Sequence, residues 1–376
     1  MSICKIFCVI SLPALAVLFN EYLVYYLFLN KCSWPRVDNE TTNVMVLADI
    51  HLLGVRRGYL VDKLRREWQM YIAFQTAMSL FSPQAVFFLG DLFDEGLWGD
   101  DATFSTYTRR FDSLFFTPKN TRRFFAVGNH DIGFHDEITP QLLKRFTTHF
   151  NIPNGVEHVE LNNHIFVLIN SMALEGDHCW LCSKAENEID RFSQILNCTN
   201  TQNISCNSSL TIPYSRPILM QHFPLFRKSD ESCEDSNDLA PPGIIEDQFR
   251  QKLDCLSENS TLYLIEKLKP RAAFGGHVHF GCRTSWKKPV SFVEYTVPSV
   301  SSRNNWSPSF HLVSIYSDQT LTCWSRRSRR FISPFICSKS YMVAPQKGTN
   351  VAVPVGAAPK LSCPPIEQKE DSEDKP

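Results

Sequence analysis

The sequence predicts an α/β domain held behind a single N-terminal membrane-spanning helix. Short apolar runs, typical of buried strands, are separated by longer helical stretches. These runs are Val44–Ala48, Ala85–Leu89, Phe124–Val127, Ile165–Ile169, Ile218–Gln221 and Ala272–Phe274. A much longer apolar run precedes them, and 13 cysteines with six Asn-x-Ser/Thr sequons indicate an oxidising compartment.

The N-terminal run extends from Ile6 to Leu29 and exceeds the ~20 residues that cross a bilayer. A cleaved signal peptide is the alternative, but its apolar core would be shorter. The bulky stretch Tyr22–Phe28 favours a retained anchor. We assign 1–30 to a tail and transmembrane anchor and 31–43 to a stalk, with the body on the lumenal side. Glu21 is expected near the interface, with burial against a partner helix as the alternative.

Residues 44–323 are predicted to form one domain of strand, polar cluster and helix repeats. One helix is expected at Leu60–Met78, where apolar residues recur at helical spacing. Cys198–Ser215 and Ser229–Pro242 are expected to be polar surface loops. The remainder, 324–376, is predicted to be a disordered tail.

The cysteines and sequons are expected to carry disulfides and glycans. Cys179 and Cys182 form a C-x-x-C without a second such pair, which favours a disulfide, or two separate disulfides, over a zinc site. The net charge of −1 gives no basic field for a nucleic-acid partner. The predicted glycosylation sites are Asn39, Asn197, Asn203, Asn207, Asn259 and Asn305.

Polar clusters follow five of the predicted strands directly. They are Asp49-Ile50-His51, Gly90-Asp91 through Asp94, Gly128-Asn129-His130-Asp131, His222, and Gly275-Gly276-His277-Val278-His279. Ligands of α/β sheets gather at the carboxyl ends of strands, so these clusters can converge on one point. Carboxylate, imidazole and amide oxygen suit Mn, Fe, Zn or Mg better than copper. Two metal ions need a bridging carboxylate, and Asp91 is the natural bridge.

The ordered set D-x-H, G-D-x-x-D, G-N-H-D, a lone His and G-H-x-H resembles the calcineurin-like metallophosphoesterase superfamily. The resemblance covers residues 44 to about 282. It implies a two-sheet β-sandwich flanked by helices. It also implies two divalent ions that hydrolyse a phosphoester, one held by Asp49, His51, Asp91 and His279, the other by Asp91, Asn129, His222 and His277.

The resemblance also gives roles to residues beside the ligands. His130 would protonate the leaving oxygen or bind the phosphoryl group, and Asp131 would orient it. Asp94 would support a ligand, with local capping as the alternative. His135 is a candidate for contact with substrate, and Asn170 for a place at the border of the pocket.

Longer strings, at 62–70, 90–96, 128–135, 221–227 and 295–299, are similar to superfamily members that remodel GPI anchors. That likeness implies a manganese enzyme (two Mn²⁺) of the early secretory pathway, from endoplasmic reticulum exit sites to the cis-Golgi. Its substrate would be GPI-anchored proteins or GPI glycolipid at the membrane. It would remove ethanolamine phosphate from the second mannose and so promote transport from the endoplasmic reticulum to the Golgi apparatus. Those members usually carry a second span and a basic retrieval signal, where this sequence has an acidic stretch at 367–376.

Two alternatives stay open from the residues alone. One is another lumenal phosphodiesterase, acting on lipid head groups or nucleotides. The other is a glycoprotein receptor that keeps the fold without turnover. A receptor would be expected to lose a metal ligand, and each ligand position is filled.

Overall fold

The computed structural model describes residues 3–34, 41–152, 155–176, 179–201, 212–234, 239–316, 321–324 and 340–342. The predicted glycosylation sites Asn39, Asn203 and Asn207 lie outside these ranges, as does most of the predicted tail. Within these ranges, one disulfide joins Cys179 to Cys182, the first of the two predicted alternatives, and another joins Cys233 to Cys282.

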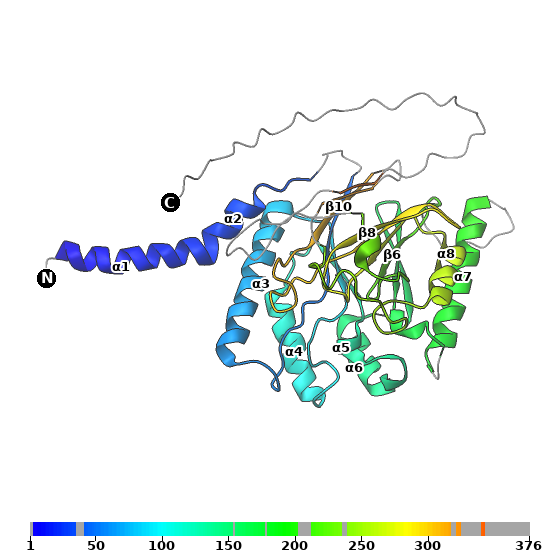
Figure 1. Cartoon of the computed structure of the whole chain (residues 1–376), viewed down its shortest axis with the longest axis horizontal. Helices are drawn as coiled ribbons and strands as arrows, with labels where there is room; N and C mark the ends of the chain where they lie inside the picture. Colours follow the sequence, from blue (N-terminus) through cyan, green and yellow to red (C-terminus); the bar gives the residue numbers. More distant parts are fainter. Residues whose placement is uncertain are drawn as a thin grey trace, which may run out of the picture. The chain divides into compact units, whose positions relative to one another are not determined.

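Two six-stranded mixed sheets form the centre of the domain (Figure 1). The first has the order β12-β11-β10-β1-β2-β3, with β1, β2 and β3 parallel. The second has the order β4-β5-β6-β7-β9-β8, with β5, β6, β7 and β9 parallel. The strands are β1 Thr42–Leu47, β2 Ala85–Leu89, β3 Arg122–Ala126, β4 Val156–Leu161, β5 His164–Ile169, β6 Ile218–Gln221, β7 Ala272–Gly275, β8 Cys282–Trp286, β9 Phe292–Thr296, β10 His311–Ile315, β11 Leu321–Trp324 and β12 Ser340–Met342.

Helices cover the outer faces of both sheets. In Figure 1, α3 and α4 lie on one side of the sheets and α7 and α8 on the other. The helices that follow the anchor region are α3 Leu60–Phe81, α4 Asp101–Leu114, α5 Asn129–Ile132, α6 Pro140–Phe150, α7 Cys182–Thr201 and α8 Glu258–Leu268, with short turns at His135–Glu137, Ser171–Ala173 and Asp230–Ser232.

An apolar core fills the space between the sheets. Phe87 of β2 stacks on Phe124 of its own sheet, with ring centroids 5.0 Å apart. Across the interface it meets Phe166 of the second sheet at 4.8 Å. Alternate side chains of both sheets continue this layer, while the other faces pack against helices. The predicted two-sheet sandwich flanked by helices is therefore confirmed.

The N-terminal helical segment comprises α1 Ile3–Leu18, the π-helical turn η1 Phe19–Leu23 and α2 Val24–Leu29. Ser11–Leu29 is long and apolar enough to cross a membrane. The end of this segment is nevertheless part of the domain, because Val24, Tyr25 and Leu29 are buried. Residues 24–29, which the prediction assigned to the membrane anchor, therefore contribute buried side chains to the domain.

The predicted strands correspond to β1, β2, β3, β5, β6 and β7, and the predicted helix to α3, which continues to Phe81. The predicted loop from Cys198 begins later, because α7 continues to Thr201. The tail assignment is wrong at one place. β12, at Ser340–Met342, pairs with β11 in antiparallel register and extends the first sheet beyond residue 323.

Candidate metal centre

The carboxylate of Asp91 lies between two groups of polar side chains at the carboxyl ends of the strands. Its Oδ2 is 3.4 Å from His51 Nε2, and its Oδ1 is 3.4 Å from His222 Nε2. Asp91 is almost completely buried. One carboxylate thus presents one oxygen to each group, which is the arrangement that a bridging ligand requires.

The first group joins the ends of β1 and β7. His51 Nε2 lies 3.2 Å from His279 Nε2, and Asp49 Oδ1 lies 3.9 Å from both nitrogens. The Asp49 carboxylate also accepts a hydrogen bond from the main-chain N–H of His277 at 2.9 Å. The D-x-H and H-x-H motifs, more than two hundred residues apart in sequence, are therefore fixed to each other.

The second group joins the ends of β3, β6 and β7. His222 Nε2 lies 3.1 Å from Asn129 Oδ1 and 3.2 Å from His277 Nδ1. The other ring nitrogen of each histidine faces a main-chain oxygen at 2.7 Å, that of Leu89 for His222 and that of Leu253 for His277. If that nitrogen donates to the main-chain oxygen, the second ring nitrogen of a neutral histidine carries a lone pair directed into the group.

This arrangement of lone pairs fits a cation. Nitrogen and oxygen acceptors at about 3 Å repel each other unless a positive charge lies among them. Burial lowers the pKa of His277 and of His279 to about 3, so both rings are neutral, as metal ligands must be. Burial also raises the pKa of Asp49 to about 6, although the neighbouring His222 and His51 act in the opposite direction. His51 belongs to the same arrangement, since its Nδ1 faces Asp94 Oδ1 at 3.3 Å.

The backbone is strained where these ligands stand. Asp49, His51, Asp91, His277 and His279 all have positive φ, between 48° and 74°. Side chains rarely adopt this conformation outside sites where the surroundings enforce it. Gly128 is equally constrained, because a Cβ there would lie 2.2 Å from Asp91. The strand ends are thus held in turns that aim the side chains inward.

His130 stands at the edge of the centre, half-buried. Its main-chain N–H donates to Asp91 Oδ1 at 2.8 Å, and its ring meets that of His51 at 4.8 Å between centroids. Ring nitrogen Nδ1 faces the main-chain oxygen of Asp94 at 3.2 Å. If Nδ1 donates to this oxygen, Nε2 is left for exchange of a proton with a ligand.

The orienting role predicted for Asp131 is wrong. Its carboxylate accepts hydrogen bonds from the main-chain N–H groups of Gly128 and Phe93, at 2.9 and 3.1 Å. Asp131 therefore shapes the turn that carries His130, while the Asp94 carbonyl orients the ring. Asp94 also supports a ligand through its carboxylate, which contacts His51.

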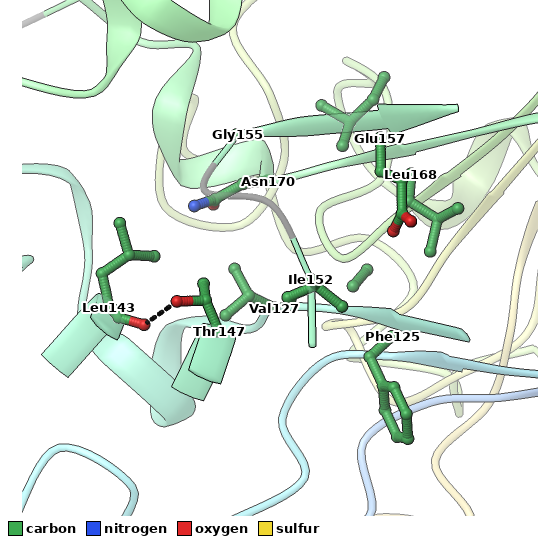
Figure 2. A pocket seen from close by; sticks show the side chains of 11 residues that line it. Phe125, Val127, Leu143, Thr147, Ile152, Gly155, Glu157, Leu168 and Asn170 are labelled. Carbon is green, nitrogen blue, oxygen red and sulfur yellow. Dashed lines mark hydrogen bonds between the residues drawn. The ribbon is translucent and has the colours of Figure 1, made fainter. Parts of the chain in front are cut away.

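The roles suggested for His135 and Asn170 stay predictions, and both side chains contact the main chain. Both ring nitrogens of His135 face main-chain oxygens, those of Met172 at 3.0 Å and Lys252 at 2.7 Å, so the ring joins two loops. Asn170 accepts a hydrogen bond from Met172 N–H at 3.2 Å. It lines a small pocket beside Leu143, Thr147 and Ile152 (Figure 2).

Residues that the motifs did not indicate complete the surroundings. Arg303 Nη1 lies 2.8 Å from Asp94 Oδ2, and Arg57 Nη1 lies 3.5 Å from the same oxygen. Both guanidinium groups are partly exposed, so they can reach an anionic substrate beside the centre. No local sequence pattern marks either arginine, since they come from loops far apart in the chain.

The glycosylation prediction for Asn305 is wrong. The side chain is buried, and its Nδ2 donates to the main-chain oxygen of His279 at 2.9 Å. Its Oδ1 accepts from Ser307 N–H at 2.9 Å. The amide is thus occupied in holding a metal-ligand segment. Asn197 and Asn259 are exposed and remain predicted acceptors.

A two-sheet sandwich with such His and Asp groups at the strand ends defines the calcineurin-like phosphoesterases. The sequence model of the family described as "Calcineurin-like phosphoesterase" matches residues 42–281.

Curated relatives narrow the class. Metallophosphoesterase 1 of Xenopus laevis is 42% identical over 316 residues, which cover 79% of this chain and 77% of the relative. The Drosophila melanogaster homolog is 41% identical over 309 residues and covers 81% of each chain. The Caenorhabditis elegans homolog is 39% identical over 319 residues, covering 83% of this chain and 82% of its own. The chain belongs to the metallophosphoesterase 1 family and is a metal-binding phosphoesterase.

Proposed function

We propose that this chain is a membrane-anchored, lumenal phosphodiesterase that removes ethanolamine phosphate from the second mannose of GPI anchors. The observation that carries the proposal is family membership at about 40% identity, joined to a complete set of ligands around Asp91. The substrate would be GPI-anchored proteins or GPI glycolipid. The proposed location is the early secretory pathway, from endoplasmic reticulum exit sites to the cis-Golgi.

Two divalent ions, which we propose are Mn²⁺, would be held by the residues described above. Asp49, His51 and His279 would bind one ion, Asn129, His222 and His277 the other, and Asp91 both. Such a pair supplies Lewis acidity, which neutralises phosphoryl charge and activates water. A receptor without turnover is disfavoured, because no described ligand position lacks a donor atom.

The chain's own groups would handle the proton and the substrate charge. His130, half-buried beside Asp91, can give a proton to the oxygen that leaves the phosphorus. The guanidinium groups of Arg303 and Arg57, which contact Asp94, would bind non-bridging phosphate oxygens. The Asp94 carbonyl, 3.2 Å from Nδ1, would orient the ring of His130 for this role.

Two features support a lumenal body on an anchor. The N-terminal helical segment is long and apolar enough to supply a membrane span, and its last residues, up to Leu29, pack on the domain. The Cys233–Cys282 disulfide joins a loop to the sheet edge, which suits an oxidising compartment. Confinement beside a lipid-borne substrate would raise its effective concentration.

The test combines a measurement in cells with an assay of the purified chain. In cells lacking the protein, mass spectrometry of GPI glycans should find ethanolamine phosphate retained on the second mannose, and the wild-type chain should restore its removal. The purified chain, stripped of metal and reloaded with Mn²⁺, should release ethanolamine phosphate faster than it cleaves phospholipid head groups or nucleotides. Unchanged glycans, with faster cleavage of those other diesters, would refute the substrate assignment.

A further inference from the structure

The first turns of α3 and the loop before them expose large apolar side chains. The exposed fraction is 77% for Val55, 88% for Tyr59, 70% for Leu60, 76% for Val61 and 59% for Leu64. We call these five residues the α3 apolar patch. Helices of globular domains normally bury such residues, and a contiguous exposed group marks a contact surface.

The patch continues into the contact between α3 and the N-terminal helix. Leu64 and Arg65 lie three and four residues after Val61, and Trp68 lies four and three residues after them, so the four residues share one face of α3. On that face, the ring of Trp68 meets Tyr22 at 5.3 Å between centroids. Arg65 Nη1 lies 3.7 Å from Glu21 Oε1. The apolar segment therefore joins the domain directly beside the patch.

The position of this contact indicates where the bilayer surface would lie. Val24, Tyr25 and Leu29 are buried against the domain and cannot be in lipid. The helical residues before them, 3–23, extend about 30 Å at 1.5 Å per residue, which equals the hydrocarbon thickness. The bilayer would thus end near η1, at the level of Trp68 and Arg65.

We propose that the α3 apolar patch lies in the interfacial layer of the membrane that holds the N-terminal span. The surrounding chain suits this layer, because residues 55–68 carry five basic and two acidic side chains that can meet lipid phosphates. Tyr22, Tyr59 and Trp68 supply the aromatic rings that gather at membrane surfaces. The occupant of the patch is therefore lipid, rather than another protein.

The same loop connects the patch to the metal centre. The main-chain N–H groups of Arg56 and Arg57 donate to the Glu95 carboxylate at 3.0 and 2.7 Å. The side chain of Arg57 lies 3.5 Å from Asp94, which contacts His51. Seating the patch on the membrane therefore places one wall of the centre near the surface. The proposed contact of the α3 apolar patch with lipid deepens the proposed function and rests on the membrane anchoring that is part of it.

The direct test measures depth. The full-length chain carrying Val61→Cys is labelled with the fluorophore NBD and reconstituted in phosphatidylcholine vesicles. The matched control is Leu262→Cys on α8. Labelled wild type gives the background from the native cysteines. NBD at position 61 should show blue-shifted emission and quenching by doxyl-labelled lipid, whereas NBD at 262 should show neither. Resistance to carbonate extraction reports the anchor separately. If the chain is anchored but the probe at position 61 stays in water, this inference is wrong and the proposed function is unaffected.

The functional test compares two substrates. The double variant Val61→Glu/Leu64→Glu changes exposed residues outside the centre. Its kcat/KM on a vesicle-borne phosphodiester should fall about tenfold, or about 1.4 kcal/mol. Its kcat/KM on soluble bis(p-nitrophenyl) phosphate should not change, and Leu262→Glu should match wild type on both. Equal loss on both substrates would contradict lipid contact. A blue shift of the probe that depends on protein concentration, without lipid quenching, would contradict it too and would indicate a protein occupant.

Discussion

The side-chain amide of Asn305 donates a hydrogen bond to the main-chain oxygen of His279 at 2.9 Å. His279 has a φ of 66°, a conformation that needs support from its surroundings. The main-chain N–H of Ser299 donates to the same oxygen at 3.0 Å. Asn305 is thus a positioning residue for the ligand that faces His51.

Replacing Asn305 by Ala is therefore expected to weaken metal binding. The lost amide frees the His279 segment, and groups that orient ligands typically contribute 10–100-fold to metal affinity. Metal titration followed by elemental analysis should show weaker retention at one of the sites. The exposed sequon variant Asn259→Ala is the control, expected to keep metal affinity; equal retention in both variants would contradict the positioning role.

The identity of Asn305 as a positioning residue could not be predicted from the sequence. The tripeptide Asn305-Trp-Ser has the same form whether it lies in an exposed loop or under a ligand. Its burial follows from tertiary packing against His279, which no local pattern records. By contrast, Asp49, Asp91 and His222 each follow a strand buried on both faces, and such strands are continuous apolar runs.

The missed strands differ from those predicted in a physical way. β8, Cys282–Trp286, is an edge strand with half-exposed side chains and no apolar run. In β4, Val156–Leu161, the apolar residues are separated by Glu157, His158 and Glu160, so no continuous apolar run is present. The positive φ values at five ligands were not predicted either, because Asp and His adopt that conformation only where the surrounding structure enforces it.

Asp94→Asn should lower metal affinity at the His51 site. Although burial raises the pKa of Asp94, the contacts with His51 and Arg303 hold it well below its usual range, so it is a carboxylate at neutral pH. An amide removes that charge and weakens the hold on His51 Nδ1, for an expected loss of about 10–100-fold. Arg303→Ala keeps the Asp94 carboxylate and should instead raise KM for an anionic substrate. Identical metal affinities in wild type and Asp94→Asn would refute the role of Asp94.

Asp91→Asn should abolish hydrolysis, with a loss of kcat on the order of 10³-fold or more. Its two oxygens face opposite groups, at 3.4 Å each from His51 and His222, and an amide nitrogen cannot serve as the second oxygen ligand. Steady-state kinetics with elemental analysis checks both turnover and metal content. Asp62→Asn, in an exposed pair with Arg66, is the control. Retained turnover in Asp91→Asn would refute the assignment of the centre.

His164 predicts how stability depends on pH at a place away from the centre. Burial, with the neighbouring Arg271, lowers the pKa of His164 to about 3. In the unfolded chain, where the histidine pKa is near 6.5, this ring is protonated below that pH, whereas in the folded chain it stays neutral. The free energy of unfolding therefore falls as the pH drops from about 6.5 towards 3.

His164→Gln should remove this loss. Between pH 7 and pH 5 the wild type should lose about 2 kcal/mol more unfolding free energy than the variant. Urea unfolding of both proteins at the two pH values, in chelator so that metal release does not contribute, gives this difference. His149→Gln, whose ring pairs with Asp112 at the surface, serves as the control for a histidine outside the sheet. Equal pH dependence in wild type and His164→Gln would show that the folded state accommodates the charged ring, contrary to its burial beside Arg271.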